Sequence, residues 1–147
     1  MRVADWMHKD PITVDADAGI NDAWRLMRRN RIRHLPVRDK GKLVGILTDR
    51  DLRLAFPSRA SSLEPHERLE LWGHVRVWEV MTRVLVTADP ETELEEAVQL
   101  LLRYKIGGLP VVRDGKLVGM LTKTDLLRAL AFCLRPRRGR PGTKVKD

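Results

Sequence analysis

The chain contains nearly the same segment twice. Residues 42–52 read KLVGILTDRDL, and residues 116–126 read KLVGMLTKTDL. Alignment of residues 7–52 with residues 81–126 needs no gap, and 19 of the 46 aligned positions are identical. A solenoid needs at least three shorter units to bury a continuous core, so two copies of this length indicate a duplicated domain half.

Each copy has the pattern of a strand, a helix, two strands and a second helix. The β-branched run at 12–14, matched by 86–88, predicts a short strand. Apolar residues at helical spacing follow at 20–27 and at 94–101. The segments LPV and KLVG, separated by a polar glycine turn, then predict a hairpin of two buried strands.

Two kinds of capping signal predict where the helices begin. Thr92 with Glu95 has the capping-box pattern for the helix that covers 94–101. Thr48 and Thr122 each stand three residues before an acid and open the second helix of their copy. One such unit cannot bury both faces of so small a sheet. We therefore expect an α/β (α+β) fold of two pseudo-symmetric β-α-β-β-α repeats packed sheet to sheet.

The chain divides by pattern and composition into a first repeat, a linker, a second repeat and a tail. In that order, these are residues 1–56, 57–78, 79–134 and 135–147. We expect the linker to form a helix that starts near Ser61 or Ser62 and ends near Gly73.

Much of the formal net charge of +8 lies in the tail. Its six basic residues and one acid contribute +5, which leaves +3 for the folded body. Proline and glycine in this segment predict a flexible appendage. A basic tail can attract phosphate, so nucleic-acid binding through it stays open as an alternative.

The cysteine and tryptophan residues indicate in which cellular compartment the chain functions and whether it forms an oligomer. Cys133 is the single cysteine and lies in an apolar run, so we expect it to be buried in a protein of the reducing cytoplasm. Neither a signal peptide nor a membrane helix is expected. The four tryptophans (Trp6, Trp24, Trp72 and Trp78) are expected to be core or interface anchors, which favours a homodimer.

The paired LPV…GKLVG[IM]LT..DL units joined by a helical linker resemble a tandem pair of CBS domains, also called a Bateman module. The resemblance covers about residues 3–132. It implies a pseudo-two-fold disc whose two clefts bind adenosyl compounds such as AMP, ADP, ATP or S-adenosylmethionine. It also implies that the disc commonly pairs with a second module.

The two Thr-x-x-Asp segments have two compatible interpretations. Thr48 with Asp51, and Thr122 with Asp125, form the capping pattern of a helix start. The same helix start, with its free N–H groups and positive pole, can face a phosphate or a ribose. The resemblance implies that each Thr lies near the ribose or phosphate and that each Asp holds the ribose hydroxyls.

The resemblance also implies that the first strand and the residues before LPV line the base and phosphate pockets. One cleft receives Ile12, Thr13, Ile32, Arg33 and His34; the other receives Val86, Thr87, Ile106, Gly107 and Gly108. Arg50 and Thr124, inside the Thr-x-x-Asp segments, complete the candidate nucleotide-binding residues.

The two copies differ where the first has Arg33-His34 and the second has Gly107-Gly108. Arg is a forked phosphate donor and His can add charge near neutrality, whereas glycines offer only backbone N–H groups and room. We therefore expect unequal clefts, with the more phosphorylated ligand at Arg33-His34, unless Arg50, Lys123 or residues of the facing repeat supply charge to either. The alternatives are a salt-bridged Arg33 and a solvated His34.

The preferred hypothesis is a regulatory module that senses adenine nucleotides or related metabolites and acts on a separate, unidentified partner protein. The alternatives are an oligomerisation adaptor without a ligand and the nucleic-acid binder described above. The sequence shows no catalytic motif and no metal-ligand spacing among its four histidines, so we expect neither an enzyme nor a metal site.

Overall fold

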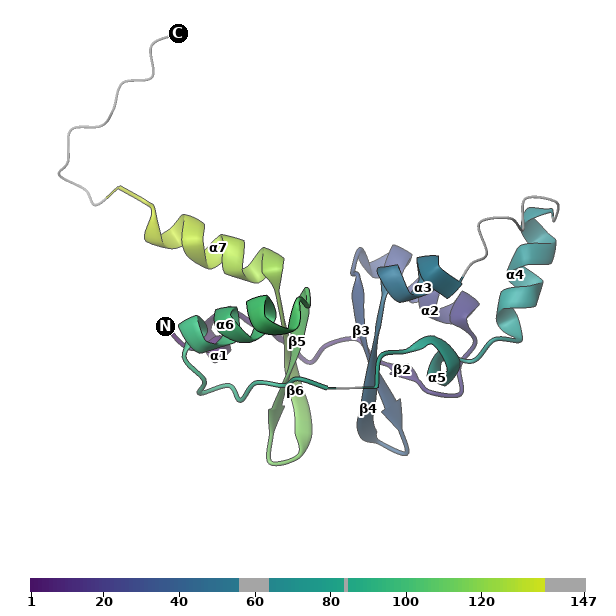
Figure 1. The fold of residues 1–147 in the computed structure, drawn as a ribbon, viewed down its shortest axis with the longest axis horizontal. Helices are drawn as coiled ribbons and strands as arrows, with labels where there is room; N and C mark the ends of the chain where they lie inside the picture. The colour runs from purple at the N-terminus through teal and green to yellow at the C-terminus, as the bar shows by residue number, and fades with distance from the viewer. Residues whose placement is uncertain (56–63, 84, 137–147) are drawn as a thin grey trace, which may run out of the picture.

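The computed structural model describes residues 1–55, 64–83 and 85–136. Two three-stranded sheets stand beside each other at the centre, with helices on the outer side of each (Figure 1). The first sheet has the order β2-β3-β4, formed by Val14–Asp15, His34–Asp39 and Lys42–Thr48. The second has the order β1-β6-β5, formed by His8–Lys9, Lys116–Thr122 and Gly108–Arg113.

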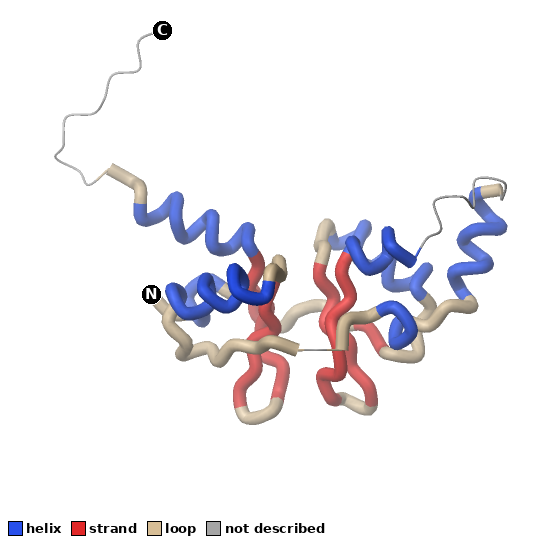
Figure 2. The backbone as a smooth tube through the Cα atoms, viewed as in Figure 1, coloured by secondary structure: helices blue, strands red, loops and turns tan. Residues whose placement is uncertain are grey.

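The helices pack on the outer flanks of these sheets, as the blue segments of Figure 2 show. On the side of the first sheet lie α2 (Ile20–Asn30), α3 (Asp49–Ala55), α4 (Pro65–Gly73) and α5 (Val77–Val80). On the side of the second sheet lie α1 (Val3–Trp6), α6 (Leu94–Tyr104) and α7 (Lys123–Cys133). The mixed α and β content and the two facing sheets confirm the predicted fold class.

The predicted hairpins form with two-residue turns. Lys40 and Gly41 join β3 to β4 with φ of 49° and 77°, and Asp114 and Gly115 join β5 to β6 with φ of 49° and 75°. Two successive positive φ values characterise the type I′ turn, whose twist matches that of the strands it joins. Glycine at the second position adopts this conformation without a steric penalty.

The two cores contain equivalent residues at a spacing of 74. Ile20, Ala23 and Met27 of α2 pack against Leu35, Val37 and Leu47 of the first sheet. Their counterparts in the second core are Leu94, Ala97, Leu101, Leu109, Val111 and Leu121. The predicted helical spacing therefore marks the buried face of α2 and of α6.

The repeats exchange the segments that precede them. Val3, at the start of the chain, is fully buried in the second core, and its N–H donates to Thr92 O at 2.9 Å. Val77, which lies before the second repeat, is fully buried in the first core, and its N–H donates to Ala18 O at 2.9 Å. Each repeat thus needs a short helix from elsewhere in the chain to complete its core, which local sequence patterns did not predict.

The helix starts differ from two of the predictions. α6 begins at Leu94 with Glu93 as its N-cap residue, so the prediction that Thr92 caps it is wrong. Thr92 Oγ1 instead accepts the N–H of Asp89 at 3.1 Å, in the turn that leads into the helix. The linker helix α4 ends at Gly73 as predicted, but it begins at Pro65. Ser61 and Ser62 lie outside the described residues.

Cys133 is exposed, which corrects the prediction that it is buried. The only buried residues of α7 are Asp125 and Ala129, so the end of this helix extends past the second core. Trp78 is also largely exposed, at 43%, whereas Trp6, Trp24 and Trp72 pack partly buried against the cores. Residues 137–147 of the basic tail lie outside the described part of the chain.

Within the described residues, no helix has the length and apolar character needed to cross a membrane.

The exchange of α1 predicts that a mutation at the start of the chain destabilises the second repeat. Val3→Ala removes two buried methyl groups and should lower the free energy of unfolding by about 2 kcal/mol. Val77→Ala should cost a similar amount in the first repeat. Urea denaturation measures both, with the exposed Leu102→Ala on α6 as a control that changes little. An unchanged midpoint for Val3→Ala would contradict the exchange.

Candidate functional site

Two arms of the chain cross between the sheets and define the surroundings of the candidate site. We call them the first arm, residues 7–13, and the second arm, residues 81–87, of which residue 84 is not described. The first arm pairs with β6 through His8 and then continues to β2, where Val14 pairs with Val37. The second arm pairs with β4 at Thr82 and leads to Ala88, which pairs with Val111. Each arm therefore contacts both repeats.

The first Thr-x-x-Asp segment forms a reciprocal cap where β4 ends and α3 begins. Thr48 N–H donates to Asp51 Oδ2 at 2.9 Å, and Asp51 N–H donates to Thr48 Oγ1 at 3.1 Å. The Thr82 hydroxyl of the second arm lies 3.4 and 3.5 Å from the two Asp51 oxygens. These distances are long for an O–H···O hydrogen bond, so the second arm holds Asp51 only weakly.

The second Thr-x-x-Asp segment has the same position at the junction of β6 and α7, but its carboxylate has more partners. Thr122 N–H and the Thr122 hydroxyl donate to Asp125 Oδ2 at 2.8 and 2.9 Å. His8 Nε2 of the first arm lies 2.9 Å from Asp125 Oδ1, and Arg128 Nη1 donates to the same oxygen at 3.4 Å. Asp125 is 1% exposed, and the partners of its carboxylate are a backbone N–H, a hydroxyl and two basic side chains.

Sequence reasoning missed His8 and Thr82, the arm residues that meet the two carboxylates. They occupy equivalent positions, immediately after Met7 and Met81, and they differ between the repeats. That difference within a matched stretch was visible in the alignment. Only the structure shows that these two positions contact Asp125 and Asp51.

His34 is a residue of the first repeat that also contacts the second repeat. A Cβ added at Gly107 would lie 3.0 Å from His34 Nε2, and one added at Gly108 would lie 3.1 Å from His34 Cδ2. The imidazole therefore packs on the backbone of the two glycines that replace Arg33 and His34 in the second repeat. The room that the sequence predicted beside Gly107-Gly108 is partly filled by His34, which also corrects the alternative of a solvated surface histidine.

Burial lowers the pKa of His34 below its ordinary value, and the nearby charges act in both directions. The carboxylates of Asp49 and Asp51 raise the pKa, whereas Arg33 and Lys123 lower it. Lys123 starts α7, so this histidine is influenced by charges of both repeats. A lowered pKa leaves His34 mostly neutral at pH 7, so it does not supply the positive charge that the sequence suggested for this position.

The remaining candidate residues divide by burial. Ile32 and Ile106 pack partly buried against the first and the second core, and Val86 packs against the second. Thr13 and Gly107 are partly buried, and Gly108 is buried. The exposed members are Ile12, Arg33, Arg50, Thr87 and Thr124. Neither Arg33 nor Arg50 makes a side-chain hydrogen bond or ion pair to another described residue, so the salt-bridged alternative for Arg33 finds no support in this part of the chain.

Backbone contacts place the residues before each LPV segment beside a helix start. Arg33 O accepts the N–H of Asp49 at 3.1 Å, and Gly107 O accepts the N–H of Lys123 at 3.0 Å. Arg33-His34 therefore lie next to the first residue of α3, and Gly107-Gly108 next to that of α7. These positions bring the pre-LPV residues close to the capped carboxylates.

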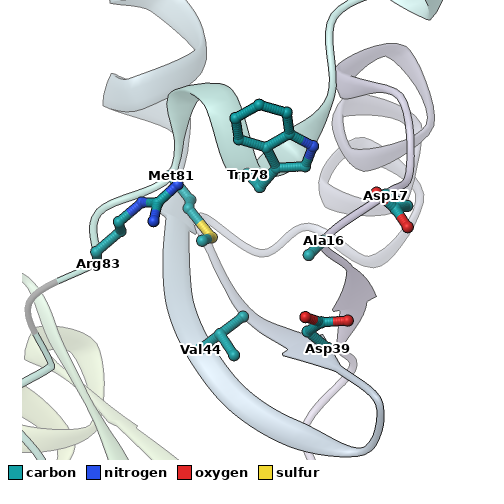
Figure 3. A pocket seen from close by; sticks show the side chains of 7 residues that line it. All are labelled: Ala16, Asp17, Asp39, Val44, Trp78, Met81 and Arg83. Carbon is teal, nitrogen blue, oxygen red and sulfur yellow. The ribbon is translucent and has the colours of Figure 1, made fainter.

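A cavity of about 370 Å³ lies in the first repeat, between α5, the first sheet and the start of the second arm (Figure 3). Its lining residues are Ala16, Asp17, Asp39, Val44, Trp78, Met81 and Arg83. None of the sequence-predicted site residues lines it. At the equivalent place in the second repeat, Glu91 pairs with Arg2 and Arg113. The described residues contain no group of three or more His, Cys, Asp or Glu side chains that could hold a metal ion.

The lowered pKa of His34 predicts a specific pH dependence of stability. The unfolded chain binds a proton near the ordinary pKa of 6.5 and the folded chain only at lower pH, so stability is lost as the pH falls through this window. The free energy of unfolding of the unchanged protein should therefore decrease between about pH 7 and pH 5 more steeply than that of His34→Gln. Urea denaturation across this range measures the slopes. His66→Gln, at an exposed position on α4, is the control, and parallel slopes for His34→Gln would contradict the prediction.

Comparisons with known proteins agree with this geometry. The sequence matches the CBS domain twice, over residues 3–58 and 77–132. A CBS domain-containing protein of Dictyostelium discoideum is 38% identical over 132 residues, which are 88% of this chain and 91% of that protein. The crystal structure of CBSX2 in complex with AMP is 33% identical, with a TM-score of 0.73 over 91% of this chain and 98% of that one.

A second solved structure is the CBS domain pair of protein MJ0100 in complex with 5′-methylthioadenosine and S-adenosyl-L-methionine. It is 31% identical, with a TM-score of 0.73, over 88% of this chain and 99% of that one. Both matched segments start at the exchanged helices α1 and α5 and together include both capped carboxylates. This chain therefore belongs to the CBS-domain family, as a tandem pair of CBS domains.

Proposed function

We propose that this CBS pair is a regulatory module that binds adenosyl compounds in two clefts and transmits their presence to a separate partner protein. The observation that supports it most is the pair of Thr-x-x-Asp caps, each of which lies at a helix start and faces an arm shared by both repeats. Similar CBS pairs have been solved with AMP and with S-adenosyl-L-methionine. AMP, ADP, ATP and S-adenosylmethionine are therefore the candidate ligands.

The proposed binding mode uses the free face of each helix start. A carboxylate that accepts the N–H of its own N-cap residue still has lone pairs for the two hydroxyls of a ribose, as an acid does in dinucleotide-binding folds. Asp51 and Asp125 would take this role, with Thr48 and Thr122 beside the ribose or phosphate. Arg33, whose carbonyl accepts the N–H of Asp49, lies beside the start of α3, and Arg50 and Lys123 belong to the helix starts themselves, so all three would attract phosphate there.

The arms explain how binding could reach a partner. A ligand at either carboxylate would contact one repeat through the helix start and both repeats through the arm. It would thus favour one relative position of the two sheets, and a partner protein that distinguishes those positions would respond. We infer a regulatory and not a catalytic role, because the polar groups of the Thr-x-x-Asp segments serve as caps and as ligand acceptors in this mechanism.

Ligand binding should raise the thermal stability. At about a hundred times its dissociation constant, a ligand adds roughly 2.7 kcal/mol, which in a chain of this size raises the unfolding midpoint by several degrees. Differential scanning fluorimetry with AMP, ADP, ATP and S-adenosylmethionine measures this shift. Asp51→Asn and Asp125→Asn should each reduce the shift and together abolish it, since Asn keeps a capping oxygen but loses the charge.

A matched variant separates loss of a cap from loss of a ligand contact. Glu67 caps α4 by accepting the N–H of Glu64 at 3.0 Å, and this helix lies at the far edge of the first repeat (Figure 1). Glu67→Gln should change the basal midpoint but not the shift produced by a ligand. No shift with any compound, in a folded protein free of copurified nucleotide, would favour the adaptor hypothesis.

We further propose that two copies of the chain associate through α7. Leu127, Leu130 and Leu134 are 65%, 52% and 71% exposed and recur at the spacing of one helix face. An exposed apolar stripe of this kind is typical of an interaction surface. The homodimer predicted from the tryptophans would thus involve leucines of α7, whereas Trp6 and Trp24 pack on the cores.

Charges on this stripe should disrupt the dimer. Leu127→Glu with Leu130→Glu should convert a dimer to a monomer in sedimentation velocity experiments, because burial of two unpaired carboxylates is unfavourable. Leu71→Glu on α4 replaces a leucine that is also half exposed and should leave the assembly unchanged. This interface would be contradicted if the wild-type protein is a monomer, or if the double variant stays dimeric.

A further inference from the structure

The two capped carboxylates occupy equivalent positions but have different neighbours. Asp125 Oδ1 has His8 Nε2 at 2.9 Å and Arg128 Nη1 at 3.4 Å. Among the described residues, Asp51 has the Thr82 hydroxyl, at 3.4 and 3.5 Å, in addition to its own cap. Two basic side chains thus contact the Asp125 oxygen that the cap leaves free, whereas no described residue forms an ion pair with Asp51.

The difference follows from two substitutions between the repeats. At the spacing of 74, His8 corresponds to Thr82, and Arg128 corresponds to Leu54. Both basic partners of Asp125 are therefore replaced by uncharged residues at Asp51. The cap itself, Thr48 with Asp51 or Thr122 with Asp125, is the same in both repeats.

The contacts of His8 and Arg128 compete with a ribose for one oxygen. Asp125 is 1% exposed, so a ligand reaches its carboxylate only if one of these side chains moves. Both side chains are about 60% exposed and can move into solvent without unfolding the core. A ribose can use this oxygen only after the contacts of His8 and Arg128 are broken, so the loss of these contacts offsets part of the free energy of ligand binding.

We propose that His8, together with Arg128, determines the affinity of the Asp125 cleft by occupying its carboxylate in the ligand-free chain. The Asp51 cleft, which lacks both partners, fills first. This inference rests on the proposed function and adds to it an order of filling and the residue that sets it. His8 acts here as a competitor of the ligand, in contrast to a residue that binds phosphate directly.

The test measures AMP binding to the Asp125 cleft alone. Asp51→Asn removes the other carboxylate, and isothermal titration then gives the dissociation constant of the remaining cleft. Adding His8→Thr, which installs the residue of the first repeat, should tighten this binding by about tenfold, and adding Arg128→Leu should tighten it further. Circular dichroism checks that each variant is folded, and S-adenosylmethionine serves as a second probe.

The reciprocal exchange tests the same idea at the other cleft. Thr82→His with Leu54→Arg, in an Asp125→Asn background, should weaken AMP binding at Asp51 by a similar factor. His66→Thr on α4, the helix at the outer edge of the first repeat (Figure 1), is the control for loss of a histidine and should leave both dissociation constants unchanged.

The outcomes distinguish this inference from the proposed function. Tighter binding after His8→Thr supports the inference. Weaker binding shows that His8 holds the ligand, and unchanged binding shows that it does neither; both results overturn the inference while the adenosyl-binding function stands. If neither the unchanged protein nor any variant binds AMP or S-adenosylmethionine, the proposed function fails and the inference fails with it.

Discussion

The structure depends on the exchange of two short helices between the repeats. A small three-stranded sheet with two flanking helices leaves part of its core open, and Val3 and Val77 close these openings in the opposite repeat. The exchange requires two arms to cross the middle of the molecule. Because those arms pass the ends of β4 and β6, they bring His8 and Thr82 to the capped carboxylates. The same crossing of the chain therefore completes the two cores and brings the arm residues to the two carboxylates.

Duplication followed by divergence explains how a pseudo-symmetric fold can hold two candidate sites with different neighbours. The hairpin turn type and the Thr-x-x-Asp caps are shared by the repeats, and their core positions are equivalent. Two of the differences lie where the halves meet: His34 packs on Gly107 and Gly108, and His8 stands beside a buried carboxylate where the other repeat has a threonine. A glycine pair in one repeat thus accommodates the imidazole of the other. Strict symmetry at this contact would place two histidines in the space of one.

Features with a local physical cause were predictable from the sequence. A glycine after Lys40 or Asp114 dictates a tight turn, and the spacing of Ile20, Ala23 and Met27 dictates a buried helix face. The caps at Thr48 and Thr122 depend on residues only three positions away. The burial of Cys133 was misjudged because it depends on where the second core ends along α7, which an apolar run does not reveal.

The sequence by itself determined the duplication, the buried faces of α2 and α6, the hairpins and the identity of the paired Thr and Asp residues, because each depends on a periodicity or on contacts between near neighbours. Only the tertiary structure decided which arm meets which carboxylate, and that His34 lies against the glycines of the other repeat. His8 and Asp125 are more than a hundred positions apart, and their contact exists because the first arm pairs with β6 before it reaches its own repeat. The pairing of distant segments follows from core closure, which no local pattern encodes.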